Sequence, residues 1–559
     1  MKTKICYLLI TFSIVLAMVL SACGGGATPT PEPTAVPPTE IPTTPPQQPT
    51  SEPTKEPIKT PEVEEIIGSE TMFNAPSDLD PSQVFDYSFH FLLNVYETLT
   101  WFNPPGSSEM LSPKLATSWE SNKEATEWTF NLRKGVKFHD GTDFNAQAVK
   151  FSFERSSKPG MNNAFIFDAI QEMEIVDDYT IKFNCKYSAP LALIFSAGFG
   201  AWIMSPTAVG DKDSAWFNQG NDAGTGPYTF ESYEPGQRLV LTRFEDYWGG
   251  WENGQFTKVI YETVPDAATR EQMLRNGDVD IAEDIDEESY AALAKESGIA
   301  VNITPSFAML FGFFNETKPP LDNMKVRQAL AYSFPYDDAL KIVQGGHGKP
   351  GRGTVPELIW GHDPNLVVPF DQEKAAQLLE EAGYPKGAGL RELVIWTYAG
   401  GAPVFQKLAE LWQAKLAEIG VTLKIVPMEM GSIWDAAFHN PKNAYDMLLR
   451  YWTPTFPTPY DLMFMNFDSA MKGTCCNLGY YSNPKFDELI KEANIVSGYD
   501  LEKASQMFQE AQRMLVDDAA GIFIANPDLV FFYRANITGL VNNPSYGGHP
   551  LWYGIRKSE

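Results

Sequence analysis

Three cysteines in the main body of the chain are the residues whose chemistry is easiest to name from sequence. Cys185 stands alone, whereas Cys475 and Cys476 are adjacent. An odd number of thiols allows at most one disulfide among the three. The adjacent pair could close a vicinal disulfide, or one of the two could bridge to another segment. Free buried thiols, or a soft-metal site shared with a histidine, are the remaining alternatives.

Residues that could act as a base or hold a metal ion do not form a recognisable constellation. His139 precedes an Asp-Gly turn, where a histidine bonded to the backbone is commoner than a metal ligand. The acidic run between Asp278 and Glu288 lacks EF-hand spacing and is typical of a solvated edge or helix start. No Gly-x-Ser-x-Gly or His-Glu-x-x-His sequence occurs, and the chain has only 6 histidines. We therefore expect no catalytic residues, no metal site and no cofactor.

The first residues have the pattern of a secretion signal. Lys2 and Lys4 precede an apolar run from residue 5 to 20, and Leu20-Ser-Ala-Cys23 follows. This order resembles a bacterial lipobox, which predicts removal of residues 1–22 and lipidation of Cys23. The apolar run is shorter than the roughly 20 residues that a spanning helix needs. A signal anchor or an ordinary signal peptide is the alternative.

A Pro/Thr-rich segment follows the lipobox. From Ala27 to Pro61 the residues are mostly proline, threonine, glutamate, glutamine and serine. Such a segment cannot bury enough apolar surface to offset its ordering entropy, and its prolines favour polyproline II. Residues 23–65 are therefore predicted to be a lipid-anchored, disordered tether. We expect the lipid to be the only contact with the bacterial cell membrane.

The charge balance excludes some partners. The chain has 71 acidic and 43 basic residues and a formal charge of -28. So negative a surface argues against nucleic acid as a partner and against adsorption to anionic lipid. The composition is that of an acidic extracytoplasmic protein.

The elements that must position any site are of mixed α/β type. About 500 residues after the tether exceed what one hydrophobic core usually supports, so two or more lobes are expected. Apolar residues at helical spacing predict helices behind Asp371, ending at Gly383, and over 404–419 and 501–515. Alternation predicts strands over 128–132, 238–243, 393–398 and 421–426.

A series of motifs in collinear order carries a family resemblance. They are Leu79–Pro81, Asn94–Leu99, Leu115–Glu120, Trp128–Arg155, Gly224–Tyr228, Tyr247-Trp248, Arg270–Ala282, Pro320–Leu330, Leu378–Tyr384 and Tyr481–Asp487. Together they resemble the extracytoplasmic solute-binding proteins of ABC importers, in the oligopeptide/dipeptide/nickel-binding group (solute-binding protein family 5). The resemblance runs from about Ser69 to the C-terminus.

The resemblance implies a two-lobed α/β clamshell of the periplasmic-binding-protein type. Lobe one, with an extra subdomain, would comprise residues 66–310 plus 528–559, and lobe two residues 311–527. Two hinge strands near Leu310–Asn315 and Ile522–Asn526 would join them. A ligand that contacts both lobes favours the closed state. The implied function is capture of a small solute for an ABC permease and its ATPase by a monomeric receptor. A sensor that presents its closed form to a membrane signalling partner is the alternative.

The solute is where the sequence departs from the family. Peptide binders of the group carry Trp-x-x-Asp, whose aspartate pairs with the peptide's α-amino group, but here Thr455 follows Trp452 at that spacing. Loss of such a charged partner typically costs about 2–5 kcal/mol. Peptide is therefore the family default, whereas an oligosaccharide or another non-peptide solute is suggested by Thr455. Arg450 is a weaker candidate. The candidate ligand-binding residues are Trp434, Tyr451, Trp452, Thr453, Thr455, Trp202 and Trp552.

Overall fold

The computed structural model describes residues 65–70, 78–84, 88–158, 160–399, 403–474 and 476–558, with residues 65–70 described for the backbone only. The predicted signal peptide, Cys23, the tether up to residue 64, and Cys475 lie outside the described residues. Within the described part of the chain, no helix is both long and apolar enough to cross a membrane.

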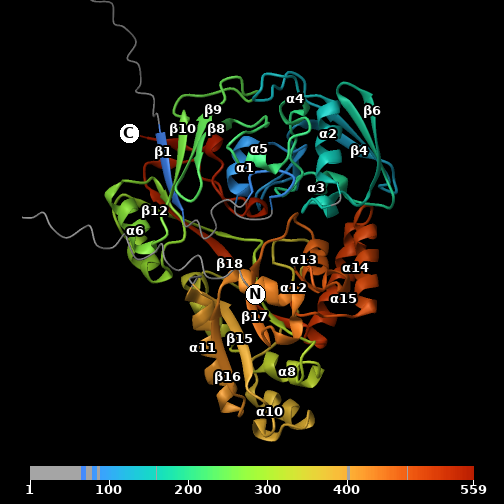
Figure 1. Cartoon of the computed structure of the whole chain (residues 1–559), viewed down its shortest axis with the longest axis vertical. Coiled ribbons are helices and arrows are strands. Elements are labelled where there is room, and N and C mark those ends of the chain that lie inside the picture. The colour runs from blue at the N-terminus through green and yellow to red at the C-terminus, as the bar shows by residue number, and fades with distance from the viewer. Residues whose placement is uncertain are drawn as a thin grey trace, which may run out of the picture. The chain divides into compact units, whose positions relative to one another are not determined.

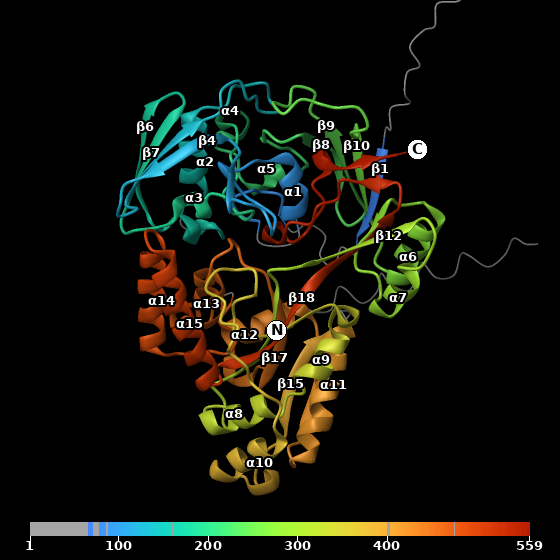
Figure 2. The ribbon, with the colours of Figure 1, turned by 180° about the vertical axis from the view of Figure 1, so that it is seen from behind.

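One large mixed sheet extends through the described chain. Its strands follow the order β16-β15-β17-β13-β18-β11-β1-β10-β9-β8, and β12 and β14 also pair with β18. The first part of β18 (Gly521–Arg534) pairs with β13 (Met309–Phe314), and its last part pairs with β12 (Ile299–Pro305). One long strand therefore belongs to both halves of the sheet (Figures 1 and 2).

We call the half that contains β12 lobe one (Figure 1). It also contains the end of β18 and the C-terminal segment. Its other elements are β1 (Glu65–Glu70), α1 (Phe89–Val95), β2 (Thr100–Phe102), β3 (Leu111–Pro113), α4 (Pro206–Val209), α5 (Ser214–Phe217), β8 (Tyr228–Glu234), β9 (Arg238–Arg243), β10 (Lys258–Thr263), α6 (Ala267–Asn276), β11 (Ile281–Ala282), α7 (Tyr290–Leu293), β19 (Ile537–Thr538) and β20 (Arg556–Lys557).

A separate antiparallel sheet forms the extra subdomain of lobe one. Its strand order is β4-β5-β7-β6, and α2 and α3 lie beside it (Figure 2). A phenylalanine-rich core, including Phe130, Phe153 and Phe183, fills this subdomain. The elements are β4 (Ala116–Ser121), β5 (Glu127–Leu132), α2 (Ala146–Ser156), β6 (Ile170–Asp177), β7 (Thr180–Cys185) and α3 (Leu191–Ile194).

Lobe two contains β13 and the start of β18, and helices surround its half of the sheet (Figure 1). Apolar residues of α8, α10 and α11 meet the strands in a second core. The elements are α8 (Met324–Tyr332), α9 (Tyr336–Ile342), β14 (Gly348–Pro350), α10 (Gln372–Glu381), β15 (Leu393–Tyr398), α11 (Pro403–Glu418), β16 (Leu423–Met428), α12 (Met430–His439), β17 (Met447–Trp452), α13 (Pro459–Phe467), α14 (Pro484–Ser497) and α15 (Leu501–Asp517).

Local signals placed these elements accurately. Asp371 accepts a hydrogen bond from the Lys374 amide at the start of α10, as its capping position predicts. The predicted strands correspond to β5, β9, β15 and β16, although β16 begins two residues later, at Leu423. The predicted helices over 404–419 and 501–515 are α11 and α15.

Two chain segments cross between the lobes, at 306–308 and 526–528. Ser306–Ala308 connects β12 to β13, and β18 runs antiparallel beside both strands. The Asn526 side chain donates to the carbonyls of Ser306 (3.0 Å) and Ala308 (2.8 Å). The Ser306 hydroxyl donates to the carbonyl of Pro527. These bonds tie the two crossing segments together at the point where the lobes join.

We expect Asn526→Ala to lower the free energy of unfolding by about 1–2 kcal/mol, because two buried carbonyls lose their donor. Urea unfolding of the full chain measures this, with Asn443→Ala as the control because Asn443 is exposed. Equal unfolding midpoints for the two variants would show that the bonds contribute nothing to stability.

Candidate ligand-binding site at the end of β17

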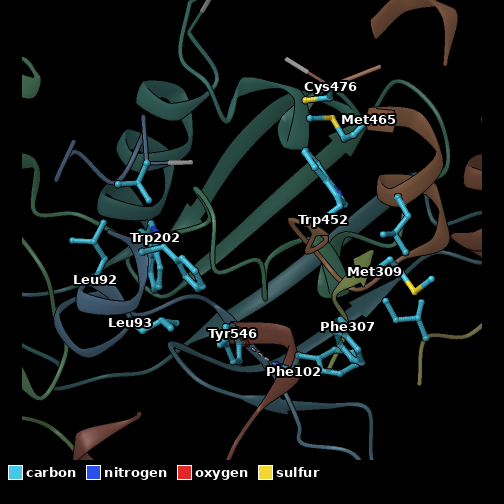
Figure 3. Close-up of a cluster of buried hydrophobic side chains, with 14 of the residues drawn as sticks. Leu92, Leu93, Phe102, Trp202, Phe307, Met309, Trp452, Met465, Cys476 and Tyr546 are labelled. Carbon is cyan, nitrogen blue, oxygen red and sulfur yellow. Dashed lines mark hydrogen bonds between the residues drawn. The ribbon is translucent and has the colours of Figure 1, made fainter. Parts of the chain in front are cut away.

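The end of β17 lies where buried side chains from both lobes meet. Trp452, the last residue of β17, is opposite Met309 of β13 in the antiparallel ladder and is 5% exposed. Its ring belongs to one buried cluster with Trp202 of lobe one and Met465 of α13 (Figure 3). An aromatic side chain thus stands at the boundary of the two lobes.

Arg450 lies against two of the predicted ligand-binding residues, Trp434 and Trp452. Its guanidinium carbon is 4.6 Å from the ring centre of Trp434 and 4.7 Å from that of Trp452. Alternate residues of a strand share a face, so Arg450 and Trp452 project to the same side of β17. Cation–π attraction therefore holds both indoles in place, and the guanidinium covers one face of each ring. That face is not available for stacking on a sugar ring.

Tyr451 projects to the opposite side of the sheet. Its ring packs 5.4 Å from that of Phe405 in α11, at the core of lobe two. Tyr451 and Trp452 therefore do not form a joint platform, although they are adjacent in sequence. Thr453 is half-buried just beyond the end of the strand.

The segment after Trp452 turns directly into α13. Thr458 caps this helix by accepting from the Asp461 amide at 3.2 Å. The Asp461 side chain points back and its Oδ2 accepts from the Thr455 amide at 2.9 Å. Thr455 is 2% exposed and Asp461 1% exposed. A carboxyl group thus lies beside the residue that replaces the family's aspartate.

Asp461 was not among the candidate residues. An aspartate in the first turn of a helix is ordinarily a surface residue that complements the helix dipole. The only available signal was the Thr-Pro capping pattern at 458–459, which places residue 461 one turn into the helix. Nothing in that pattern indicates that the side chain is buried.

Burial raises the pKa of Asp461 to about 7. The backbone and side chain of Thr455 and the side chain of Trp452 act in the opposite direction, but they are neutral donors and do not outweigh the loss of solvent. Among the described residues, no lysine, arginine or histidine forms an ion pair with Asp461. The Thr455 hydroxyl and the Trp452 indole both lie at this carboxyl group.

The same segment contacts lobe one. Phe456, between Thr455 and the start of α13, is buried in the core of the lobe-one subdomain. In the turn between α14 and α15, Gly498 lies so close to Ser188 and Ala189 that an added Cβ would be 2.2 Å from the Ser188 hydroxyl and 2.9 Å from the Ala189 amide. The cluster of Trp452, Thr455 and Asp461 is therefore next to a contact between the lobes.

A pocket of about 290 Å³ opens beside the crossing strands. Its lining includes Lys349, Arg352 and Glu357, and Gly361, in the same loop, lies against Pro459 of α13. A group bound in this pocket would lie near both the hinge and β17. The lining residues are Met309, Lys349, Pro350, Arg352, Val355, Pro356, Glu357, His362, Pro364 and Asn526.

The two predicted tryptophans of lobe one have different surroundings. Trp202 is buried in the cluster that also contains Trp452, and its Nε1 makes no hydrogen bond to any described residue (Figure 3). Trp552 packs on Tyr261, and its Nε1 donates to the Tyr261 hydroxyl. The indole nitrogen of Trp552 thus already has a hydrogen-bond partner within the protein.

The structure shows the bonding state of two cysteines and of His139. Cys476 is disulfide-bonded, and Cys475, one of the partners that the sequence allows, is outside the described residues. Cys185 is a free thiol whose pKa burial raises to about 11. His139 bonds the Gly226 carbonyl (2.9 Å) and Asp222 (2.5 Å), so the prediction of a backbone-bonded histidine is confirmed. Within the described part of the chain, no three His, Cys, Asp or Glu side chains group to hold a metal ion.

Glycines explain the Gly224–Tyr228 motif. A Cβ on Gly224 would be 1.9 Å from the Val95 carbonyl oxygen, and one on Gly226 would be 2.7 Å from it. The Gly226 amide donates to that same oxygen at 2.9 Å. The motif is a close connection against the end of α1.

Two lobes that share a pair of crossing strands, with an aromatic and acidic cluster where they meet, define a solute-binding protein of the two-lobed class. Residues 110–474 match the model of the family described as bacterial extracellular solute-binding proteins, family 5. The chain belongs to this family, which serves ABC importers and consists of extracytoplasmic binding proteins, not enzymes.

Several similar proteins are described as binding a peptide or glutathione. The chain is 30% identical over 478 residues to the probable D,D-dipeptide-binding periplasmic protein DdpA of Escherichia coli, covering 84% of this chain and 90% of the relative. It is 30% identical to the glutathione-binding protein GsiB of Pectobacterium atrosepticum over 442 residues, covering 77% and 83%. The structure of the periplasmic binding protein DppA from Helicobacter pylori with the peptide STSA aligns with a TM-score of 0.75, 25% identity and coverage of 89% and 98%.

Proposed function

We propose that this protein is the substrate-binding component of an ABC importer, which closes two lobes around a small peptide or peptide-like solute and delivers it to a membrane permease. The observation that carries the proposal is the cluster of Trp452, Thr455 and Asp461 beside a contact between the lobes. The names of the relatives support the peptide class. A receptor that buries its ligand between two lobes converts binding into a change of shape that a permease can recognise.

The moving bodies in this proposal are residues 66–310 with 528–559, and residues 311–527. The Asn526 bonds mark the segment about which they would turn. Lipidation at Cys23 and a tether over 23–65 would keep the receptor near its permease. The chain would act as a monomer, because closure needs only its own two lobes.

A non-peptide solute, such as an oligosaccharide, is the second candidate. Thr455 supports it, because a hydroxyl stands where the peptide binders have a carboxylate. The Arg450 guanidinium over Trp434 and Trp452 weighs against it, since stacking surface is lost. A sensor role would use the same closed form with a signalling partner in place of the permease.

A thermal-shift screen of the full chain tests the ligand class. The probes are di- to pentapeptides, oligosaccharides and Ni²⁺ chelates. A ligand at 100 times its Kd adds about 2.7 kcal/mol to the free energy of unfolding, which raises the melting temperature visibly. We expect shifts with short peptides. Shifts with oligosaccharides alone would overturn the peptide proposal, and stimulation of a permease's ATPase by the liganded protein separates import from sensing.

A further inference from the structure

The pocket beside the crossing segments is bounded only by lobe two and the crossing segments themselves. Met309 begins β13 and Asn526 lies in β18, and the other eight lining residues come from 349–364. A solute enclosed between two lobes contacts both of them. At about 290 Å³, the pocket is also at the lower limit of small-molecule sites. It is therefore a candidate for a second, smaller site.

Two cations of this pocket are not neutralised by an ion pair. Within the described part of the chain, neither Lys349 nor Arg352 forms one, although acidic residues outnumber basic ones by 71 to 43. Glu357 is the acid of the lining, and Asp528 on β18 interacts with Lys349 electrostatically. The lining thus has two cations against one carboxylate, besides His362. This balance favours a negatively charged ligand.

The two cations have donors available for such a ligand. Nη1 of Arg352 donates to the Pro364 carbonyl, and the side chain makes no other hydrogen bond to a described residue. A guanidinium has five N–H groups, so most of them are left for a bound anion. Lys349 lies opposite Asn526 where β14 pairs with β18, so its stem starts from a fixed strand.

The loop between β14 and α10, which forms the other wall, is fastened to α15. Gln512 donates to the Gly361 carbonyl at 2.8 Å, and Gln509 donates to the His362 carbonyl at 2.9 Å. The His362 Nδ1 donates in turn to the Val355 carbonyl at 2.7 Å. The pocket is therefore formed before a ligand arrives, which reduces the ordering cost of binding.

The rest of the lining is mostly apolar. An inorganic ion would leave that surface unused, whereas a carboxylate on a short apolar body would contact both the cations and the apolar wall. The apolar lining residues are Met309, Pro350, Val355, Pro356 and Pro364.

We propose that this pocket binds a small organic acid, whose carboxylate pairs with Lys349 and Arg352 and whose apolar body lies against Met309 and the prolines. Two sources supply this chemistry: a free acid, or an acidic end of the enclosed solute. The first source is independent of the proposed function, whereas the second rests on it.

Calorimetric titration of the full chain with hexanoate tests the site. Hexanamide has the same body without the charge, and acetate has the charge without the body. The wild type is expected to bind hexanoate at least 10-fold more tightly than either. Arg352→Gln and Lys349→Met are each expected to weaken hexanoate binding at least fivefold and to leave hexanamide binding unchanged. Lys424→Met is the matched control, because Lys424 is also an exposed strand lysine without an ion pair among the described residues.

A variant that gains affinity guards against an uninformative loss. Glu357→Gln removes the carboxylate of the lining and is expected to tighten hexanoate binding about two- to fivefold. Glu357 is exposed and forms no ion pair within the described part of the chain, so the substitution leaves the fold intact. A gain of affinity cannot arise from misfolding.

The results decide both the site and the source of the acid. Equal binding of hexanoate and hexanamide overturns the site, and so does equal hexanoate affinity in the wild type and both cation variants. Displacement of hexanoate by L-alanyl-L-leucine, but not by its C-terminal amide, supports the site and assigns the carboxylate to the solute. Simultaneous binding of hexanoate and the dipeptide supports a site for a free acid. A wild type that binds no peptide contradicts the proposed function, and the hexanoate titration still decides the site.

Discussion

Replacing Gly498 by valine is expected to weaken ligand binding by about 10- to 100-fold while leaving each lobe folded. A Cβ at this position would lie 2.2 Å from the Ser188 hydroxyl and 2.9 Å from the Ala189 amide, across the contact between α14–α15 and the lobe-one subdomain. Overpacking of this kind typically costs about 1–3 kcal/mol. In the closure proposed above, these groups come together, so that cost falls on the closed state and appears as lost affinity.

Backbone strain does not enter this result. Gly498 has φ -67, which any residue adopts, so only the side chain is at issue. The measurement is calorimetric titration with the probe that gives the largest thermal shift, together with small-angle scattering with and without it. Gly431→Val is the matched control, because a Cβ there meets nothing within 4 Å. Unchanged affinity and compaction in Gly498→Val would show that this contact is not part of the closed state.

As the pH rises from 4 to 8, the wild type is expected to lose more free energy of unfolding than the Asp461→Asn variant. The folded-state pKa is raised to about 7 from an ordinary value of 3.8. Between these values the native state holds a proton that the unfolded chain has released, so stability falls with increasing pH until the folded group has ionised. A shift of about 3 pKa units corresponds to roughly 4 kcal/mol between the two ends of this range.

Urea unfolding of both proteins at pH 4, 6 and 8 measures this difference. Other ionisable groups contribute equally to the two proteins, so the difference between them isolates Asp461. The Asp435→Asn variant is a suitable control, since that side chain is exposed on α12. A wild-type-minus-variant difference that stays constant across the range would show that Asp461 is not a destabilised carboxylate in the folded protein.

A carboxyl group that is buried without a cationic partner destabilises the folded protein once it ionises. Because the same segment contacts lobe one through Phe456, the solute would favour closure where it binds.

Much of the local structure followed from the sequence. The capping aspartate of α10 and the apolar spacing of α11 and α15 require only neighbours within a few residues, and the structure has these elements where they were expected. The family motifs also run through the whole body of the chain, so the two-lobed fold was predicted by resemblance. Both the local signals and the family motifs depend only on the order of residues along the chain.

The composition of the candidate site required the tertiary structure. Adjacent positions 451 and 452 were both predicted to bind the ligand, but strand alternation places Tyr451 against the core of lobe two and Trp452 on the other face of the sheet. Arg450 covers the indoles of Trp434 and Trp452 only because α12 packs across β17.

The sequence by itself determined the elements, the family and the absence of an aspartate at position 455. Only the tertiary structure decided that a carboxylate is nevertheless present there, supplied by Asp461. The physical reason is that burial and pairing depend on which segments the fold brings together. A sequence motif records one position, whereas the charge of a site is the sum over every side chain that reaches it.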